Sequence, residues 1–478
     1  ISIGLVGSEM CIRDRCDYHP RRAELPPARL IVSGVSPRMT PAARIAAVIE
    51  ILSELPSGEV VSVSAGAALR RGLQARRYAG SGDRQAISAL FWSVHRSLAR
   101  LGWHLGELGQ EATGRALVLA VLCLGEGKPA DEIKALFGGG EKHAPPALSD
   151  DEIEFIDRLD GRELDDAGMP RTMRLEWPEA LLADAEAALG DATDDELAAM
   201  RGEAGADIRL NPLKISNRHK LRDKLAGRGM ACHLTKLSPL GIRMTKRVRT
   251  DDTQEFRNGL FEIQDEASQI AALLCDARPS MQVADICAGA AGKSLVMAAA
   301  MENRGRIVAL DTDPERLERG AVRIRRAGIH NIERVAVSGD WGVKRYRGKF
   351  DRVVIDAPCT GSGTWRRAVD ARWRCDEDVL ADVRGQQAAL LDRGRAMVAP
   401  GGRIVYITCS LLHSEGEAQV ERILAEAPEL EIAEISDIWQ DVIGGDNCPP
   451  TQGGMLRLFP GRDGTDGFFM AVLQSRLR

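Results

Sequence analysis

Aromatic residues are scarce in this chain, since Phe, Trp and Tyr together make up 4% of its 478 residues. We therefore expect no extended platform of aromatic side chains on which successive nucleic-acid bases stack. No apolar run approaches the roughly 18–20 residues that cross a bilayer, which predicts a soluble protein without a membrane partner. The ten cysteines form no CxxC pair and no metal-finger spacing. This usage predicts a reducing cytoplasmic location, no disulfide framework and no bound metal.

The first residues also lack an initiator methionine. The segment "ISIGLVGSEMCIRDR" fits nothing that follows it and resembles translated sequencing-adaptor sequence. It is too short and wrongly flanked for a secretion signal. We therefore expect residues 1–38 to be a non-native, disordered leader and the native chain to start at Met39.

A strong excess of one charge is also missing, because the formal net charge is only −5. This average hides two opposite blocks. Residues 206–250 hold twelve Lys and Arg against two Asp, whereas residues 150–166 carry nine acidic residues. A concentrated basic block predicts contact with a polyanion even in a chain that is acidic as a whole.

Hydrophobic periodicity divides the rest of the chain into four parts. Residues 39–140 repeat apolar side chains at helical spacing, which predicts an all-α domain. Residues 141–170 break this pattern and predict an acidic linker. Residues 171–257 mix short strand patterns with the basic helix "NRHKLRDKLAGRG", which indicates a small α+β subdomain. Residues 258–478 form the last part.

Strands alternate with helices through this last part. Such alternation predicts an α/β fold, with a mostly parallel sheet covered by helices on both faces. The final pattern, "DGFFMAVLQ", predicts a late strand that pairs antiparallel at the sheet edge. The expected strands are "MQVADIC", "GRIVALD", "NIERVAV", "FDRVVIDA", "GRIVYITC" and "DGFFMAVLQ".

The stretch "VADICAGAAGKS", residues 283–294, predicts a strand that turns into a helix through small residues. Small residues allow backbone N–H groups to approach a ligand, and a helix N-terminus favours an anion. The next strand ends at Asp311, where a carboxylate is placed to bind ribose hydroxyls. These features favour a nucleoside-containing cofactor, with NAD and S-adenosylmethionine both open.

Two further strands each end in a cysteine. "VVIDAPCTGSGTWRR" carries Asp356 and Cys359, and "IVYITCSLLHSEGE" carries Cys409. Ligands bind beyond the carboxyl ends of such strands, so a thiol pair here indicates chemistry. Addition of a thiolate to C6 of cytosine makes C5 nucleophilic, and an Asp facing the ring helps the addition. A redox dithiol is the alternative. This pair lacks the CxxC spacing of such a dithiol, and a redox role would leave Asp311 and Asp356 without a function.

At these residues the sequence resembles the RsmB/NOP/Sun family of RNA cytosine-5 methyltransferases. The cofactor motif DxCAAPGGKT appears as "DICAGAAGKS", and "DAPCTGSGT" and "YITCSLLHSEGE" match the two cysteine motifs. "RLNPLK", "EIQDEASQ" and "GTDGFF" match further landmarks, so the resemblance covers about residues 40–478. It implies a Rossmann-like class I methyltransferase domain at 258–478, with S-adenosylmethionine as cofactor. It also implies that residues 39–140 are a NusB-like RNA-binding domain and 171–257 an RNA-recognition subdomain.

The resemblance assigns roles to individual residues. Cys409 is expected to be the nucleophile, Cys359 to assist proton removal and product release, and Asp356 to face the cytosine. The expected cofactor-binding residues are Cys287, Ala288, Gly289, Ala290, Ala291, Gly292, Lys293, Asp311, Asp340 and Asp356.

The basic residues near these motifs are the candidates for RNA contact. They are Arg209, Lys214, Arg218, Lys220, Arg222, Arg366 and Arg367. Trp365 is the aromatic residue expected beside the nucleotide. Contacts to several phosphates would make RNA binding fall steeply with salt.

The expected substrate is small-subunit ribosomal RNA, and we expect a monomer. A transfer-RNA methyltransferase and a catalytically weak ribosome-assembly factor that binds RNA are the alternatives. The latter is raised by Ala291, which stands where the family has glycine. If this position has a positive φ, alanine costs roughly 1 kcal/mol or more there and weakens cofactor binding.

Overall fold

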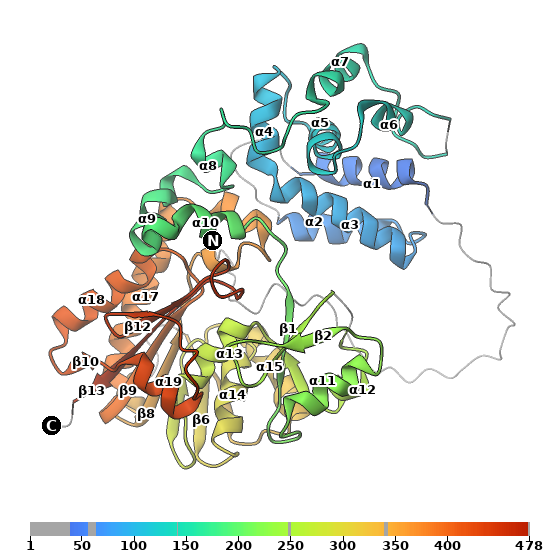
Figure 1. Ribbon diagram of the computed structural model, residues 1–478. Helices are drawn as coiled ribbons and strands as arrows, with labels where there is room; N and C mark the ends of the chain where they lie inside the picture. Colours follow the sequence, from blue (N-terminus) through green and yellow to red (C-terminus); the bar gives the residue numbers. More distant parts are fainter. Residues whose placement is uncertain (1–38, 56–63, 141, 247–249, 339–342, 477–478) are drawn as a thin grey trace, which may run out of the picture. The chain divides into compact units, whose positions relative to one another are not determined.

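The computed structural model describes residues 39–55, 64–140, 142–246, 250–338 and 343–476 (Figure 1). The expected leader, residues 1–38, lies outside this range. The chain divides into two compact units. We call residues 39–179 together with Val369–Arg374 the helical unit, and residues 180–368 together with 375–476 the α/β unit. Within the described ranges, no helix is long and apolar enough to cross a membrane.

Among its described residues the helical unit contains helices and no strand, and most of these helices share one core. Helix α1 begins after Thr40, whose hydroxyl accepts a hydrogen bond from the Ala43 N–H, and Pro41 fits its first turn. Apolar side chains on its inner face, such as Val48 and Ile51, are fully buried with those of the following helices. The helices are α1 (Pro41–Ser53), α2 (Ala65–Ala75), α3 (Ser81–Arg96), α4 (Leu98–Glu107), α5 (Gly114–Ala120), α6 (Ala130–Ala135), α7 (Asp150–Leu159) and α8 (Arg171–Arg174).

The predicted acidic linker is wrong over α7. Ser149 and Glu152 form a capping box at the start of this helix. Phe155, Ile156 and Leu159 then enter the same core as α1 and α3. Acidic side chains occupy five of the other seven positions, so a high density of charge masked a short amphipathic helix.

The α/β unit begins with α9 (Leu182–Leu189) and α10 (Thr193–Ala199), followed by a four-stranded antiparallel sheet. We call this the small sheet, and its order is β2 (Cys232–Leu234), β3 (Gly241–Met244), β1 (Ala206–Leu210) and β4 (Phe261–Ile263). Helices α11 (Arg218–Ala226) and α12 (Gln254–Arg257) pack their apolar residues into its core. The small subdomain therefore extends past the predicted boundary at residue 257, because β4 completes its sheet.

The large sheet contains nine strands among the described residues, in the order β11–β12–β13–β9–β8–β5–β6–β7, with β10 paired to β13. Its central strands β5 to β9 run parallel, as predicted. The strands are β5 (Gln282–Asp285), β6 (Arg306–Asp311), β7 (Ile332–Ala336), β8 (Phe350–Asp356), β9 (Val398–Thr408), β10 (Leu430–Ile432), β11 (Thr451–Gln452), β12 (Met455–Leu458) and β13 (Phe468–Ser475).

Strand β13 is antiparallel to β9, as predicted, but it is not an edge strand. The β11–β12 hairpin and β10 pair with its other side. These strands are two to four residues long, too short to show a period-2 pattern in the sequence.

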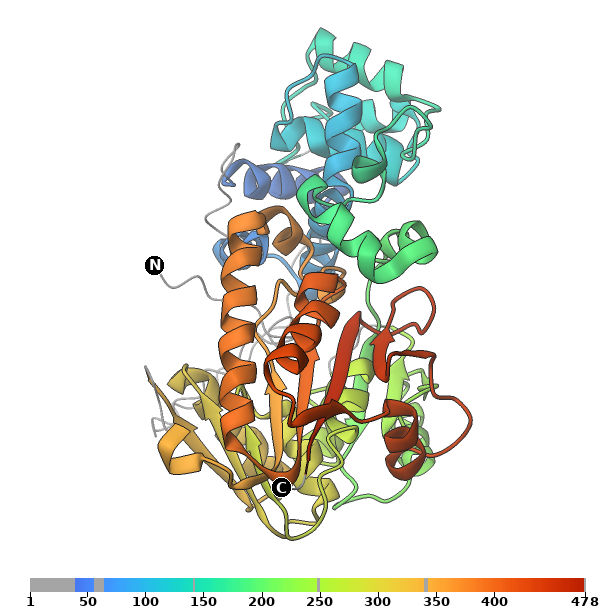
Figure 2. The same ribbon diagram turned by 90° about the vertical axis from the view of Figure 1, so that its left-hand side faces the viewer.

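Helices cover both faces of the large sheet. One face packs against α13 (Glu266–Leu273), α14 (Gly292–Ala300) and α19 (Ile435–Val442). The other face packs against α17 (Glu377–Met397) and α18 (Glu417–Glu426). Figure 2 shows α17 as the long orange helix that runs along the strands. Helix α15 (Pro314–Ala327) follows β6, and α16 (Val343–Tyr346) precedes β8.

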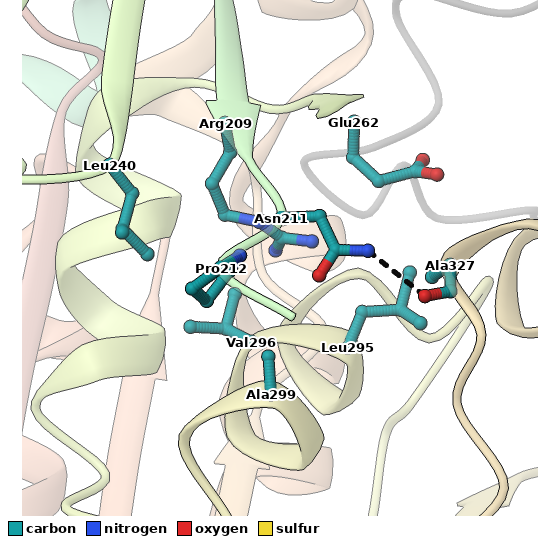
Figure 3. Close-up of a pocket in the computed structure, with 9 residues that line it drawn as sticks. All are labelled: Arg209, Asn211, Pro212, Leu240, Glu262, Leu295, Val296, Ala299 and Ala327. Atoms are coloured by element: carbon teal, nitrogen blue, oxygen red, sulfur yellow. Dashed lines mark hydrogen bonds between the residues drawn. The ribbon is translucent and has the colours of Figure 1, made fainter. Parts of the chain in front are cut away.

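The small sheet is attached to α14 and α15 through the "RLNPLK" segment. The Asn211 side-chain amide donates to the Gly259 and Ala327 carbonyls, the second bond being drawn in Figure 3. The Lys214 ammonium donates to the Asn258 and Arg326 carbonyls at 2.7 Å each. A cavity of about 10 Å³ remains at this junction, which is room for one water at most. The segment therefore joins two parts of the α/β unit.

Candidate active site

The two cysteines of the sequence motifs meet at the carboxyl ends of β8 and β9. These strands are parallel neighbours, with Asp356 opposite Ile407, so the residues that follow each strand leave the sheet side by side. The Sγ atoms of Cys359 and Cys409 are 3.4 Å apart, and both residues are buried. Two segments about fifty residues apart in the sequence thus place two thiols in direct contact.

Glycine makes the close packing behind this thiol pair possible. The Gly363 N–H donates to the Cys409 carbonyl, and the Gly467 N–H donates to the Gly363 carbonyl. A Cβ on Gly363 would lie 2.1 Å from the Gly467 carbonyl oxygen, which no side chain permits. The "TGSG" turn after Cys359 and the "DGFF" segment therefore interlock through their backbones.

Glu415 ties the two cysteine loops together. Its carboxylate accepts hydrogen bonds from the Thr360 N–H at 2.9 Å and the Thr360 hydroxyl at 2.6 Å. It also accepts bonds from the Ser410 hydroxyl and the Gln387 amide. Thr360 and Ser410 each directly follow one of the cysteines. The sequence singled out Glu415 only as part of a family motif, and its role as the link between the loops appears only in three dimensions.

The surroundings of Cys359 raise the pKa of its thiol. Its hydrogen bond with Cys409 and its burial raise the pKa of Cys359 well above its usual value, and the charge of Glu415 adds to this. Burial also raises the pKa of Glu415. Either sulfur can be the donor in the contact between the two thiols.

An ion pair lies at the end of β8 next to these loops. The Lys293 ammonium, from the first turn of α14, is 2.6 Å from a carboxylate oxygen of Asp356. The Lys293 side chain is 2% exposed and that of Asp356 is 23% exposed, so only the carboxylate is open to a ligand. Asp356 is therefore held in place by a buried cation on one side and remains reachable on the other.

The small-residue loop, residues 286–291, connects β5 to α14. The Gly289 N–H donates to the Asp311 carboxylate at 2.7 Å, so the loop lies against the end of β6. The Ser294 hydroxyl donates to Asp285 at 2.6 Å and fixes the first turn of α14 to β5. Cys287 is half-buried, and desolvation raises the pKa of its thiol well above the usual value. A close backbone, a helix N-terminus and a strand-end carboxylate are together suited to a nucleoside with a charged group.

Ala291 adopts the left-handed conformation that the sequence raised as a question, with φ +64° and ψ +26°. It caps α14 and is fully buried. A Cβ added to Gly320 of α15 would lie 3.4 Å from the Ala291 Cβ, so α15 packs directly on the loop. The methyl group is accommodated, but its backbone conformation is strained for an L-residue. The remaining predicted cofactor residue, Asp340, lies outside the described residues.

Several arginines expected to bind RNA are instead buried in ion pairs. Arg366 and Arg367 both contact the carboxylate of Asp466, and Arg367 also contacts Asp265 at 2.8 Å. The Arg367 side chain is 4% exposed, so it is not available to a phosphate. The prediction for Arg366 and Arg367 is therefore wrong, because two acidic residues that are distant in the sequence contact them in the interior.

The basic segment 206–250 is likewise partly used inside the protein. Arg209 is buried and donates to the Gln264 side chain and to the Gly292 carbonyl, so its prediction as an RNA contact is wrong. Arg218 is half-buried and donates to the Thr235 and Ser238 carbonyls. The Lys214 ammonium is held by the carbonyls described above. Of the predicted set, Lys220 is exposed and Arg222 pairs with Asp223 beside it on α11.

Trp365 also differs from the prediction that placed it beside a nucleotide. It is 1% exposed, and its indole N–H donates to the Thr360 carbonyl at 3.3 Å. It is therefore a core residue that supports the Cys359 loop from behind.

Among the described residues, no cluster of His, Cys, Asp and Glu could hold a metal ion.

Comparisons with known proteins agree with the motif resemblance. The model of the family described as 16S rRNA methyltransferase RsmB/F matches residues 272–474. The chain is 32% identical to a probable ribosomal RNA small subunit methyltransferase B of Synechocystis and 30% identical to ribosomal RNA small subunit methyltransferase F of Cronobacter sakazakii. These matches cover 62% of this chain and 66% and 63% of the two relatives, so the chain spans just under two thirds of their length.

A solved structure shows a similar fold over most of the chain. The crystal structure of PH0851 matches with a TM-score of 0.71 at 23% identity, and it covers 91% of this chain and 99% of that one. At this identity the likeness concerns the fold. The family model, the sequence matches and the paired cysteine motifs together place residues 272–474 in the RsmB/F family of methyltransferases.

Proposed function

We propose that the protein is an S-adenosylmethionine-dependent RNA cytosine-C5 methyltransferase that acts on small-subunit ribosomal RNA. The observation that carries this proposal is the contact between Cys359 and Cys409 at 3.4 Å, at the ends of two adjacent parallel strands. A redox pair would also bring two thiols together, but it would not need Asp356 and Lys293 beside them. The relatives named for small-subunit ribosomal RNA support the substrate.

The residues around the small-residue loop fit S-adenosylmethionine. The carboxylate of Asp311 ends β6 and lies against the loop, where it is placed for ribose hydroxyls. Small side chains at 288–291 let the backbone approach the ligand closely. When bound, S-adenosylmethionine supplies an electrophilic methyl group. The cofactor-binding residues proposed here are those that the family motif implies. Among them, Asp356 is the residue nearest in sequence to the thiol of Cys359.

The reaction is proposed to start at Cys409. Its thiolate adds to C6 of cytosine, so a sulfur–carbon bond forms and the 5,6 double-bond electrons become available at C5. The negative charge that develops on the ring nitrogen edge is neutralised by a proton from solvent, and the Asp356 carboxylate, held by Lys293, is placed to accept a hydrogen bond from the N–H groups of that edge. C5 then takes the methyl group while Cys409 remains bonded to C6.

Release then requires loss of the C5 proton. A base removes this proton, its electron pair restores the double bond, and the sulfur–carbon bond to Cys409 breaks. We assign assistance in this step to Cys359, because its thiol already contacts the Cys409 sulfur. A variant without Cys359 is therefore expected to form the adduct but release it slowly.

An assembly factor that binds RNA without turnover is the second candidate. The observation in its favour is Ala291, whose left-handed backbone costs about 1–2 kcal/mol relative to a relaxed conformation. If this strain distorts the loop, the cofactor binds weakly. Direct titration with S-adenosylmethionine separates the two candidates.

The test of the proposal uses the chain from Met39 as wild type, Cys359→Ala, Cys409→Ala and the control Cys275→Ala. Cys275 is a buried cysteine of the same core, and its thiol bonds to the Ala271 carbonyl rather than to another thiol, so it controls for the loss of a buried cysteine near the site. Each protein is incubated with small-subunit ribosomal RNA and labelled S-adenosylmethionine, then run on a denaturing gel. We expect methyl transfer by wild type and Cys275→Ala, and a gel-stable RNA adduct with Cys359→Ala but not with Cys409→Ala. Binding of RNA without adduct or methyl transfer in any protein would favour the assembly factor.

A further inference from the structure

Two buried arginines hold the small-residue loop on either side of Ala291. Arg323 of α15 donates to the Ala290 carbonyl at 3.1 Å. Arg209 of β1 donates to the Gly292 carbonyl, also at 3.1 Å. Both arginines are buried, with relative exposures of 5% and 3%. The strained residue thus lies between two carbonyls that are each fixed by a guanidinium.

The small sheet anchors both guanidinium groups. Glu262 of β4 pairs with Arg323 at 3.1 Å, and Gln264, which follows β4, accepts a bond from Arg209 at 2.6 Å. Arg209 and Glu262 are cross-strand partners in β1 and β4, and Figure 3 shows both side chains at the junction with α14. Burial raises the pKa of Glu262, but Arg323 and Arg326 outweigh this and lower it overall. The anchor is therefore ionised at neutral pH.

Fixing these carbonyls also fixes the N–H groups in the same peptide planes. The peptide that contains the Gly292 carbonyl also contains the Lys293 N–H, and peptide bonds are planar. This N–H belongs to the first turn of α14, where helical N–H groups have no intrahelical acceptor and point toward a ligand. The peptide of Ala290 carries the Ala291 N–H, which bonds to the Ala288 carbonyl and closes the turn. A shift of either carbonyl would therefore rotate the donors of the loop.

We propose that Arg209, Arg323 and Glu262 form a clamp that positions the small-residue loop for S-adenosylmethionine, so that the small sheet controls the affinity of this site. The inference rests on the proposed function, because it assumes that the cofactor binds at this loop. The three residues are positioning residues, since they act on the ligand through the backbone of residues 290–292. The clamp also explains how alanine is tolerated at position 291, because the turn is held from outside.

Arg326→Gln provides a matched control. Arg326 also pairs with Glu262 and packs over the Phe256 ring at 3.8 Å, so its replacement removes a comparable buried contact. Its guanidinium bonds to Glu262 and not to a carbonyl of the loop in the described contacts. A purely structural role for the network predicts that Arg209→Gln, Arg323→Gln and Arg326→Gln behave alike.

Three readouts test the clamp: the Kd for S-adenosylmethionine by calorimetry, thermal unfolding without cofactor, and hydrogen exchange of the amides at 287–293 without cofactor. We expect Arg209→Gln and Arg323→Gln to weaken binding about tenfold, equal to about 1.4 kcal/mol. We also expect faster exchange at 287–293 in both. Arg326→Gln should stay within about twofold of wild type in Kd while losing a similar amount of thermal stability. Equal effects of all three variants on Kd and exchange would overturn the clamp.

Two further results keep the outcomes distinct. Where a Gln variant fails to fold, the Lys variant at the same position is used, because lysine keeps the positive charge but lacks the planar guanidinium. The clamp requires this Lys variant to show the same faster hydrogen exchange at 287–293. If wild type does not bind S-adenosylmethionine, the proposed function fails, whereas hydrogen exchange at 287–293 still decides whether the clamp holds the loop.

Discussion

Removing the Glu415 carboxylate, which joins the two cysteine loops, should lower the free energy of unfolding strongly. Replacing it with a neutral amide of the same shape should not. Glu415 is fully buried and accepts four hydrogen bonds, two from N–H groups of Thr360 and Gln387 and two from the hydroxyls of Thr360 and Ser410. In Glu415→Ala all four donors lose this acceptor. Hydroxyls can rotate to other partners, but the N–H groups of Thr360 and Gln387 cannot, so two buried donors are left without an acceptor.

The magnitude follows from these contacts. Each buried donor left without an acceptor costs about 1–3 kcal/mol, so Glu415→Ala should lose about 2–6 kcal/mol of unfolding free energy. In Glu415→Gln, the oxygen that faces the Thr360 N–H and the Gln387 amide is retained. The new amide group faces two hydroxyls, which can act as acceptors. Glu415→Gln should therefore lose less than about 1 kcal/mol of unfolding free energy.

Urea denaturation of the three proteins measures this difference, and methyl transfer measures its consequence for the thiol pair. We expect Glu415→Ala to lose both stability and methyl transfer, because Thr360 and Ser410 no longer hold their neighbouring cysteines. Glu415→Gln should keep the fold, and it should also lower the pKa of Cys359 because the carboxylate charge raises it. Equal stability losses in the two variants would refute the reasoning from hydrogen-bond partners.

Three further predictions concern the surroundings of the site. Burial, followed by the charge of Asp466, raises the pKa of Asp265 from its ordinary value of 3.8 to about 7. Between these two pH values the carboxyl of Asp265 is protonated in the folded state and ionised in the unfolded state. Unfolding free energy should thus fall as pH rises through this window, and Asp265→Asn should flatten that part of a denaturation profile; an unchanged slope would contradict the assignment. Ala291→Gly removes left-handed strain but makes the unfolded chain more flexible, so we expect up to about 1 kcal/mol more stability in urea, and a net loss would show that the alanine is unstrained. Ser294→Ala leaves a buried oxygen of Asp285 without its hydroxyl donor at 2.6 Å, which should lower the unfolding free energy by about 1–3 kcal/mol in the same assay, whereas no loss would mean that this bond contributes nothing.

The parallel part of the large sheet and the meeting of the two cysteines could be predicted from the sequence. Each strand is an apolar run that ends in polar or small residues, and parallel strands bring their carboxyl ends to one edge. The left-handed position of Ala291 could also be anticipated, because the family places glycine there.

What the sequence could not show depends on contacts between distant segments. Arg366 and Arg367 follow an active-site motif and look like phosphate contacts, but Asp265 and Asp466, about a hundred residues away on each side, pair with them in the interior. Arg209 likewise belongs to a basic segment yet is buried against α14. A charge pattern shows how many cations a segment has, but not which acidic residues the fold brings to them.

The most direct test of the two-cysteine account is to identify the residue bonded to RNA. The Cys359→Ala protein is incubated with small-subunit ribosomal RNA and S-adenosylmethionine, digested with protease and nuclease, and analysed by mass spectrometry. The account predicts a peptide that contains Cys409 and carries one methylated cytidine. A cytidine adduct on another residue, or no adduct from a protein that binds both RNA and S-adenosylmethionine, would contradict it.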